Sequence, residues 1–260
     1  MLLSRAAFSP REVARAGDIW RAFQDVAVGG SSAAGWPPER YIEERVSFIV
    51  RTMVVLHHRE THHGEALRGV TWPSGFRREM FFRRECRLRG ERGPVASATQ
   101  DWVHVSADLK LVRASEDLLS SFPAEDHEPP VEMPGYEPIE GAPTHRSELQ
   151  VWHTWMDPLG HVNHPRYVDW ADEALARAIG PAGVAPVSVR AVAEAAHYRT
   201  GAVAGERVHI ETRLIGATDQ GDAVCRHDMR VGDRTLARVT TVRGLDTADP
   251  SLLVAALQAC

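Results

Sequence analysis

Two stretches far apart in the chain share a pattern: residues 63–71 read HGEALRGVT and residues 204–212 read AGERVHIET. Their Gly-Glu pairs stand 141 positions apart, and an apolar segment follows each pair. Residues 95–99 (VASAT) and 236–240 (LARVT) match at the same offset of 141. A repeat kept in one order and one register predicts two copies of a single structural unit.

A third correspondence lies near the start of each half. Gly17-Asp18-Ile19-Trp20 and Gly160-His161-Val162-Asn163 both precede an apolar helical pattern, at an offset of 143. Between the halves, residues 123–138 are rich in proline and acidic side chains. Proline fixes φ and removes backbone donors, which favours an extended linker. We therefore expect an N-terminal unit over residues 1–122, a linker over 123–143 and a C-terminal unit over 144–260.

Each half is expected to contain one long helix and several strands. Pro165 suits the first turn of a helix that runs to Ile179, where Gly180-Pro181 ends it. The other expected elements are a helix over residues 18–28 and strands over residues 46–57, 66–72, 79–89, 95–105, 150–155, 187–198, 207–215, 223–231 and 235–243. A long helix packed on consecutive antiparallel strands is an α+β architecture. Edge-to-edge pairing of the two sheets would hide two exposed edges.

The composition favours a folded protein that binds neither nucleic acid nor a membrane. The net charge of −5 gives no general attraction to polyanions. No segment approaches ~18 consecutive apolar residues and the N-terminus lacks an apolar leader, which predicts a cytoplasmic location. Cys86, Cys225 and Cys260 form no C-x-x-C pair, so we expect no disulfide, no metal site and no cofactor.

The stretch with the most chemical content is residues 155–167, WMDPLGHVNHPRY. Asp157, Gly160 and His161 stand directly before a predicted helix, whose first backbone N–H groups attract anions. Acyl transfer creates an oxyanion, and losing one aimed donor costs ~3 kcal/mol of the barrier. Gly160 has no Cβ to obstruct a substrate carbonyl. These residue types in this order suit acyl-transfer chemistry, but taken alone they fit a plain turn better.

The repeat offers an internal comparison for this stretch. Placing Gly17 on Gly160 puts Ala14 where Asp157 stands and Asp18 where His161 stands. The first half then lacks both the carboxylate and the imidazole, so we expect one active site per chain.

Each of these residues also has a purely structural interpretation. Asp157-Pro158 followed by Gly160 is a turn sequence, Asn163 suits a helix cap, and Tyr167 and Trp170 have the spacing of core residues. The histidines at 57, 58, 62 and 63 resemble a metal cluster, but solvated strand ends explain them better. The arginines at 77, 78, 83, 84, 87, 89 and 92 fit equally a solvated sheet face and a docking surface for coenzyme A phosphates or an acidic carrier protein.

The stretch resembles the D-x-x-G-H-V-N-x-x-x-Y motif of hotdog thioesterases. In the first half, residues 71–78 (TWPSGFRR), Phe82-Arg83-Arg84-Glu85 and Trp102-Val103 resemble the T-W…R-R…W-V signature of double-hotdog acyl-ACP thioesterases. The likeness extends from about Phe8 to Arg243. It implies two fused hotdog folds, hydrolysis of an acyl thioester on a carrier protein or coenzyme A, and a chain that is compatible with a homo-oligomer.

The resemblance also implies roles for individual residues. Asp157 and His161 take the positions of the catalytic pair with Gly160 beside them, and the implied substrate-binding residues are Asn163, Tyr167, Arg83 and Arg84. Leu159 replaces an asparagine of the plant enzymes, and a glutamate of those enzymes falls near Gly201. A hotdog dehydratase or hydratase and a degenerate acyl-binding protein are the alternatives. The histidine, Phe-Pro and Pro-Gly pattern typical of dehydratases is absent.

Overall fold

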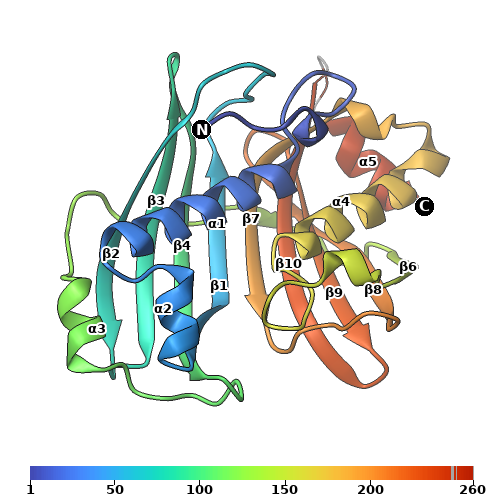
Figure 1. The fold of residues 1–260 in the computed structure, drawn as a ribbon. Helices are drawn as coiled ribbons and strands as arrows, with labels where there is room; N and C mark the ends of the chain where they lie inside the picture. The colour runs from blue at the N-terminus through green and yellow to red at the C-terminus, as the bar shows by residue number, and fades with distance from the viewer. Residues whose placement is uncertain (247–248, 250, 260) are drawn as a thin grey trace.

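The chain forms one ten-stranded sheet with two long helices across the same face (Figure 1). The computed structural model describes residues 1–246, 249 and 251–259. The elements of the first half are η1 (Arg5–Ala7), α1 (Ala16–Ala33), α2 (Pro38–Glu43), β1 (Val46–His57), β2 (Arg68–Arg77), β3 (Phe81–Gly90), β4 (Gly93–Ser106) and α3 (Glu116–Ser121). Those that follow are β5 (Glu137–Pro138), β6 (Thr144–Gln150), η2 (His153–Trp155), α4 (Arg166–Ile179), η3 (Gly180–Ala182), η4 (Pro186–Ser188), β7 (Val189–Tyr198), β8 (Arg207–Ala217), β9 (Ala223–Val231), β10 (Arg234–Leu245) and α5 (Ser251–Ala259).

The sheet is mirrored about its centre. Its order is β2-β3-β4-β1-β7-β10-β9-β8-β5, and β6 also pairs with β8. Strands β1 and β7 pair antiparallel at the seam, from Thr52 opposite His197 to Leu56 opposite Ala193. Outward from the seam, β1, β4, β3 and β2 correspond to β7, β10, β9 and β8. The two Gly-Glu repeats therefore lead into equivalent strands, β2 and β8, and the prediction of two α+β units of one fold with paired sheets is confirmed.

Both long helices form because their apolar residues follow the helical period. In α1 the buried side chains include Ile19, Trp20 and Phe23, and in α4 they include Val168 and Ala171. These side chains join one core cluster with residues of both halves of the sheet. The halves therefore share a continuous core, and the loops at the starts of α1 and α4 are held against the partner half.

Two local predictions were wrong. Only Gln150 of the strand predicted over residues 150–155 lies in a strand, because β6 ends there. The Val151 amide still donates to the Glu206 carbonyl oxygen at 2.8 Å, but residues 152–155 make no further strand pairing. The chain instead turns into η2, where the Trp155 amide donates to the Trp152 carbonyl oxygen at 3.1 Å. Gly17 does not correspond to Gly160, since Gly17 lies inside α1 and Gly160 lies in the turn before α4.

The linker runs along the sheet. The Glu125 amide donates to the Pro73 carbonyl oxygen at 2.8 Å, and Met133 packs against Ala193 and Val224 of the second half. The unit boundaries at residues 122 and 143 stay predictions. None of the described helices is long and apolar enough to cross a membrane. Cys86 and Cys225 are free and buried, and Cys260 lies outside the described residues.

Candidate active site

The loop between η2 and α4 is closed by its own hydrogen bonds. The Asp157 amide donates to the His161 carbonyl oxygen at 2.8 Å, and the Gly160 amide donates to the Asp157 carbonyl oxygen at 3.0 Å. The Leu159 amide donates to Asp157 Oδ1 at 2.9 Å. Gly160 has φ +77° with open space where a Cβ would stand, so the turn needs glycine for its left-handed backbone. The predicted role of Gly160 as a close-approach point for a substrate carbonyl stays a prediction.

Asp157 and His161 lie side by side in this loop. His161 Nδ1 is 3.4 Å from Asp157 Oδ2, and the two side chains are 22% and 13% exposed. The separation is that of an ion-pair contact. The Asp157 carboxylate raises the pKa of His161 above its usual value, against the opposing effect of burial. Both side chains are thus partly exposed, and Asp157 Oδ1 accepts the hydrogen bond that closes the turn.

Gly201 allows His161 to occupy its position. A Cβ on residue 201 would lie 2.6 Å from His161 Cβ and 2.8 Å from His161 Cγ. The adjoining Ala202 is fixed from two sides, because its carbonyl oxygen accepts from the Val162 amide at 2.8 Å and its amide donates to Tyr167 Oη at 3.0 Å. A glutamate could not stand at residue 201 while His161 kept this position. The sequence departure at Gly201 therefore has a steric reason.

Tyr167 has the core position that its helical spacing predicted, whereas Asn163 does not act as the predicted helix cap. Tyr167 is 1% exposed, so its side chain is part of the core and positions the 201–202 segment. Asn163 does not cap α4 with its side chain, because the N-cap residue is Pro165 and has no side-chain cap bond. Asn163 Oδ1 is buried without a hydrogen-bond partner among the described residues. That oxygen lies next to the loop as an acceptor for a ligand or water.

His164 belongs to the site although the sequence did not single it out. Burial lowers its pKa to about 3, so the ring is neutral at physiological pH. Its Nε2 atom is buried and has no hydrogen-bond partner in the described part of the chain. His161 Nδ1 likewise makes no hydrogen bond there, although it lies 3.4 Å from Asp157 Oδ2. The ring packs among the aromatic rings of Trp20, Trp102 and Tyr198, with centroids 6.0 to 6.5 Å away. Trp20 and Trp102, which both belong to the first half, thus pack against His164 of the second half.

The two predicted arginines do not join this loop. Arg83 is half exposed on β3 and its Nε donates to Asp101 Oδ1 at 2.7 Å. Arg84 is 3% exposed and donates to the Ala27 carbonyl oxygen at 2.7 Å, near the end of α1. Arg84 therefore stabilises the helix and is not available on the surface, which corrects its prediction as a docking residue. Arg83 keeps that role as a proposal.

Comparison with known proteins agrees with this architecture. Residues 151–248 match the family model of the thioesterase-like superfamily. No curated protein sequence matches the chain.

Several solved structures cover nearly the whole chain, and three of them are acyl thioesterases by name. A protein assigned as an oleoyl thioesterase from Lactobacillus plantarum shares 18% identity over 94% of both chains, with a TM-score of 0.79. The 12:0-ACP thioesterase from Umbellularia californica shares 14% identity over 95% of this chain and 92% of its own (TM-score 0.75). An acyl-ACP thioesterase from Bacteroides thetaiotaomicron shares 12% identity over 94% and 95% (TM-score 0.73). Residues 151–248 thus match the thioesterase-like superfamily, and the chain as a whole is a double-hotdog protein.

Proposed function

We propose that the protein hydrolyses an acyl thioester to a free acid and a thiol, with Asp157 as the group that acts on substrate or water. The observation that carries this proposal is the pair of Asp157 and His161 in a closed turn, where Gly201 leaves room for the His161 side chain. The neighbouring His164 packs against Trp102 of the other half. The family match over residues 151–248 supports thioester hydrolysis in general.

The chemistry can follow two routes. Asp157 Oδ2 either removes a proton from a water that attacks the carbonyl carbon, or attacks that carbon itself to give a mixed anhydride that water then hydrolyses. In both routes the carbon–sulfur bond breaks and the electron pair leaves with sulfur. A thiol with a pKa near ~8.5 can depart as a thiolate without an obligatory acid, so His161 serves to polarise the carbonyl or to orient water.

We propose acyl groups on a carrier protein or on coenzyme A as the substrates. The solved acyl-ACP thioesterase structures with this fold support a carrier-bound acyl group. Arg83 is the proposed contact for an acidic carrier, since it lies half exposed at the sheet face.

The test is thiol release across a panel of acyl-CoA and acyl-carrier-protein substrates, comparing the wild type with Asp157→Asn. Asparagine keeps the Oδ1 acceptor for the Leu159 amide but removes the base and the nucleophile. We expect kcat to fall at least ~10²-fold with little change in stability. Asp233→Asn, in an exposed turn, is the matched control and should keep the wild-type rate. Wild-type turnover by a folded Asp157→Asn protein would move the proposal to an acyl-binding function.

A further inference from the structure

A loop in the first half repeats the geometry of the candidate active-site loop. The 3-10 turns η1 and η2 start at Arg5 and His153, which are 148 positions apart. A β-bridge then joins Phe8 to Ala14 in the first half and Met156 to Val162 in the second, again 148 positions apart. The offset of 148 between the loops differs from the offset of 141 between the strands. The two loops therefore do not align when the strand repeats are placed in register.

The hydrogen bonds inside the two loops are the same. The Ser9 amide donates to the Val13 carbonyl oxygen at 2.8 Å, as the Asp157 amide does to that of His161. The Glu12 amide donates to the Ser9 carbonyl oxygen at 2.9 Å, as the Gly160 amide does to that of Asp157 at 3.0 Å. Glu12 even adopts φ +60°, a left-handed conformation that non-glycine residues seldom take. The shape of the loop is therefore kept although its side chains differ.

This equivalence changes the predicted correspondence between the halves. Ser9, and not Ala14, stands at the position of Asp157, and Val13, and not Asp18, stands at the position of His161. These two positions have neither a carboxylate nor an imidazole, and Glu12 stands where Gly160 does, so we do not expect this loop to hydrolyse a thioester.

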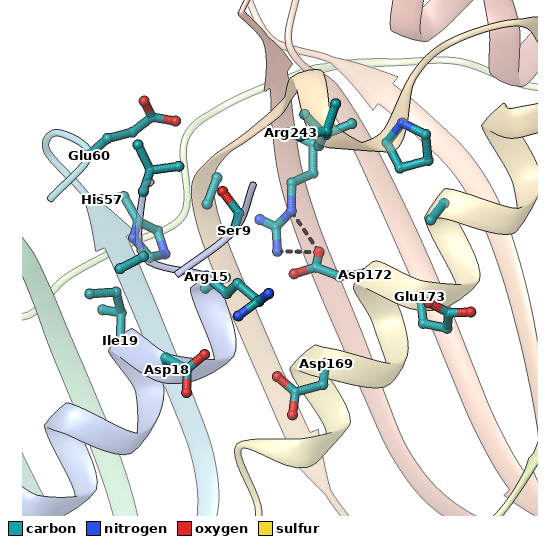
Figure 2. A pocket seen from close by; sticks show the side chains of 18 of the residues that line it. Ser9, Arg15, Asp18, Ile19, His57, Glu60, Asp169, Asp172, Glu173 and Arg243 are labelled. Atoms are coloured by element: carbon teal, nitrogen blue, oxygen red, sulfur yellow. Dashed lines mark hydrogen bonds and ion pairs between the residues drawn. The ribbon is translucent and has the colours of Figure 1, made fainter. Parts of the chain in front are cut away.

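The first-half loop nevertheless lines a cavity of about 850 Å³ (Figure 2). Ser9 and Val13 contribute from the loop, Ile19 from α1, and Leu175 and Val189 from the second half. None of Asp157, Gly160 and His161 lines it. Its size falls within the ~300–1,000 Å³ typical of small-molecule sites.

The charges around the cavity balance each other. Five arginines and five carboxylates line it. Arg243 is 1% exposed and donates to Asp172 Oδ1 at 2.9 and 2.8 Å and also to Glu194. Figure 2 shows its two bonds to Asp172. Nine of these ten charged groups have an ion-pair partner, and Arg15 donates to the Ala6 carbonyl oxygen at 2.7 Å. The walls therefore offer hydrogen bonds and apolar contacts with most of their charge already paired. An uncharged ligand with amide groups and methylenes fits such a lining better than a free anion does.

We propose that this cavity binds the pantetheine arm of an acyl thioester and does not hydrolyse it. The arm is a neutral chain of amides, a hydroxyl and methylenes, and it is common to coenzyme A and carrier proteins. The choice of ligand rests on the proposed function, because a ligand received by the Asp157 loop would meet the same backbone frame at the Ser9 loop.

Isothermal titration calorimetry of the full chain with an S-alkyl pantetheine thioether tests the proposal, since the thioether cannot be hydrolysed. We expect two sites per wild-type chain. Ala176 lies on α4 and lines the cavity, so Ala176→Trp should fill the cavity and reduce the count to one while thiol release stays within about twofold of wild type. Arg177→Trp, on the same helix but outside the cavity lining and largely exposed, is the matched control and should keep both sites.

A diazirine-bearing pantetheine thioether gives a second measurement on the unmodified protein. We expect labelled peptides from residues 5–19 and 172–191 as well as from the Asp157 loop. Labelling of the Asp157 loop alone, or a wild-type count of one that Ala176→Trp leaves unchanged, would overturn the proposal. Failure of the proposed function looks different, because thiol release would then be absent across the substrate panel whatever the number of bound arms.

Discussion

At the scale of single residues, the position of His161 is decided by a carboxylate on one side and a missing side chain on the other. Asp157 lies 3.4 Å from its Nδ1 atom, and Gly201 leaves the room that its Cβ and Cγ require. Gly201 therefore matters to the candidate site as Asp157 and His161 do. A catalytic side chain displaced by about 1 Å can reduce the reaction rate about 100-fold.

Gly201→Ala should therefore reduce activity without touching a charged group. The new Cβ would lie 2.6 Å from His161 Cβ, so the imidazole must shift. We expect kcat to fall about 10- to 100-fold in the thiol-release assay. Gly29→Ala in α1 meets nothing within 4 Å and is the control. Full activity of Gly201→Ala would show that the reaction does not depend on this placement of His161.

The pKa of His161 is itself measurable by NMR titration of its ring protons. In the wild type we expect a value above 6.5, because the Asp157 carboxylate stabilises the imidazolium. Asp157→Asn should lower this pKa. A pKa raised by folding adds stability that is fully present below the unfolded-state value near 6.5 and is lost as the pH rises through the folded-state value. An equal His161 pKa in wild type and variant would refute the pairing.

At the scale of elements, neighbouring residues of β3 have opposite roles. Arg83 faces solvent with Asp101 as its partner, whereas Arg84 packs under α1 with Nη2 3.2 Å from Ser31 Oγ. The side-chain alternation of a strand separates them, since successive residues point to opposite faces of the sheet. The arginine-rich stretch thus contains both a buried residue that supports α1, Arg84, and an exposed residue on the opposite face, Arg83.

Charge reversal separates these two roles. Arg84→Glu should destabilise the fold by roughly 3 kcal/mol or more, because it places a carboxylate beside the Ala27 carbonyl oxygen in the interior. Arg83→Glu should leave the free energy of unfolding within about 1 kcal/mol of wild type and raise KM for an acidic carrier with kcat retained. Urea unfolding and steady-state kinetics measure both. An unchanged KM for every carrier would show that Arg83 is only exposed to solvent and does not bind the carrier.

At the scale of the whole molecule, buried polar groups tie the two halves together. Glu194 on β7 accepts from Trp20 Nε1 at 3.0 Å and contacts His57 Nε2 at 2.8 Å, both from the first half. Burial alone would raise the pKa of Glu194, but His57 and Arg243 bring it down to about 2. His57 is thus a buried partner across the seam, which corrects its interpretation as a solvated strand end. The charge keeps its stabilising effect until the pH falls well below the usual range of a glutamate.

Two buried histidines make the stability of the fold sensitive to acid at higher pH values than Glu194 does. Burial lowers the pKa of His164 and of His227 to about 3. Between pH 6.5 and 3 the unfolded chain therefore binds protons that the folded chain excludes, so stability falls as the pH falls, by roughly 1.4 kcal/mol per pH unit for each histidine. His227 contacts Thr212 and Thr241 at 2.9 and 3.1 Å.

His227→Gln keeps a polar group between the two threonines but cannot be protonated. Urea unfolding at pH 7 and at pH 4.5 should show a smaller loss of stability for this variant than for wild type. An exposed substitution, Asp233→Asn, should leave the pH dependence unchanged. Equal losses in His227→Gln and wild type would contradict the role of this buried imidazole.

The sequence by itself determined the two-unit α+β fold, nearly all strand positions and the chemistry-bearing loop. These features follow from local signals: the Gly-Glu repeats before β2 and β8, the apolar period of α4, and Asp157, Gly160 and His161 within five consecutive residues. Such signals act over a few residues, so they need no knowledge of distant contacts.

Only the tertiary structure decided which residues stand around that loop. Gly201, Trp102 and His164 meet His161 or its neighbours because β4, the segment after β7 and the start of α4 converge across the seam. The correspondence of Ser9 with Asp157 also came from hydrogen bonds and φ values, since the loop offset of 148 differs from the strand offset of 141. A sequence records order along the chain, whereas burial, close approach and pairing depend on the distances that packing creates.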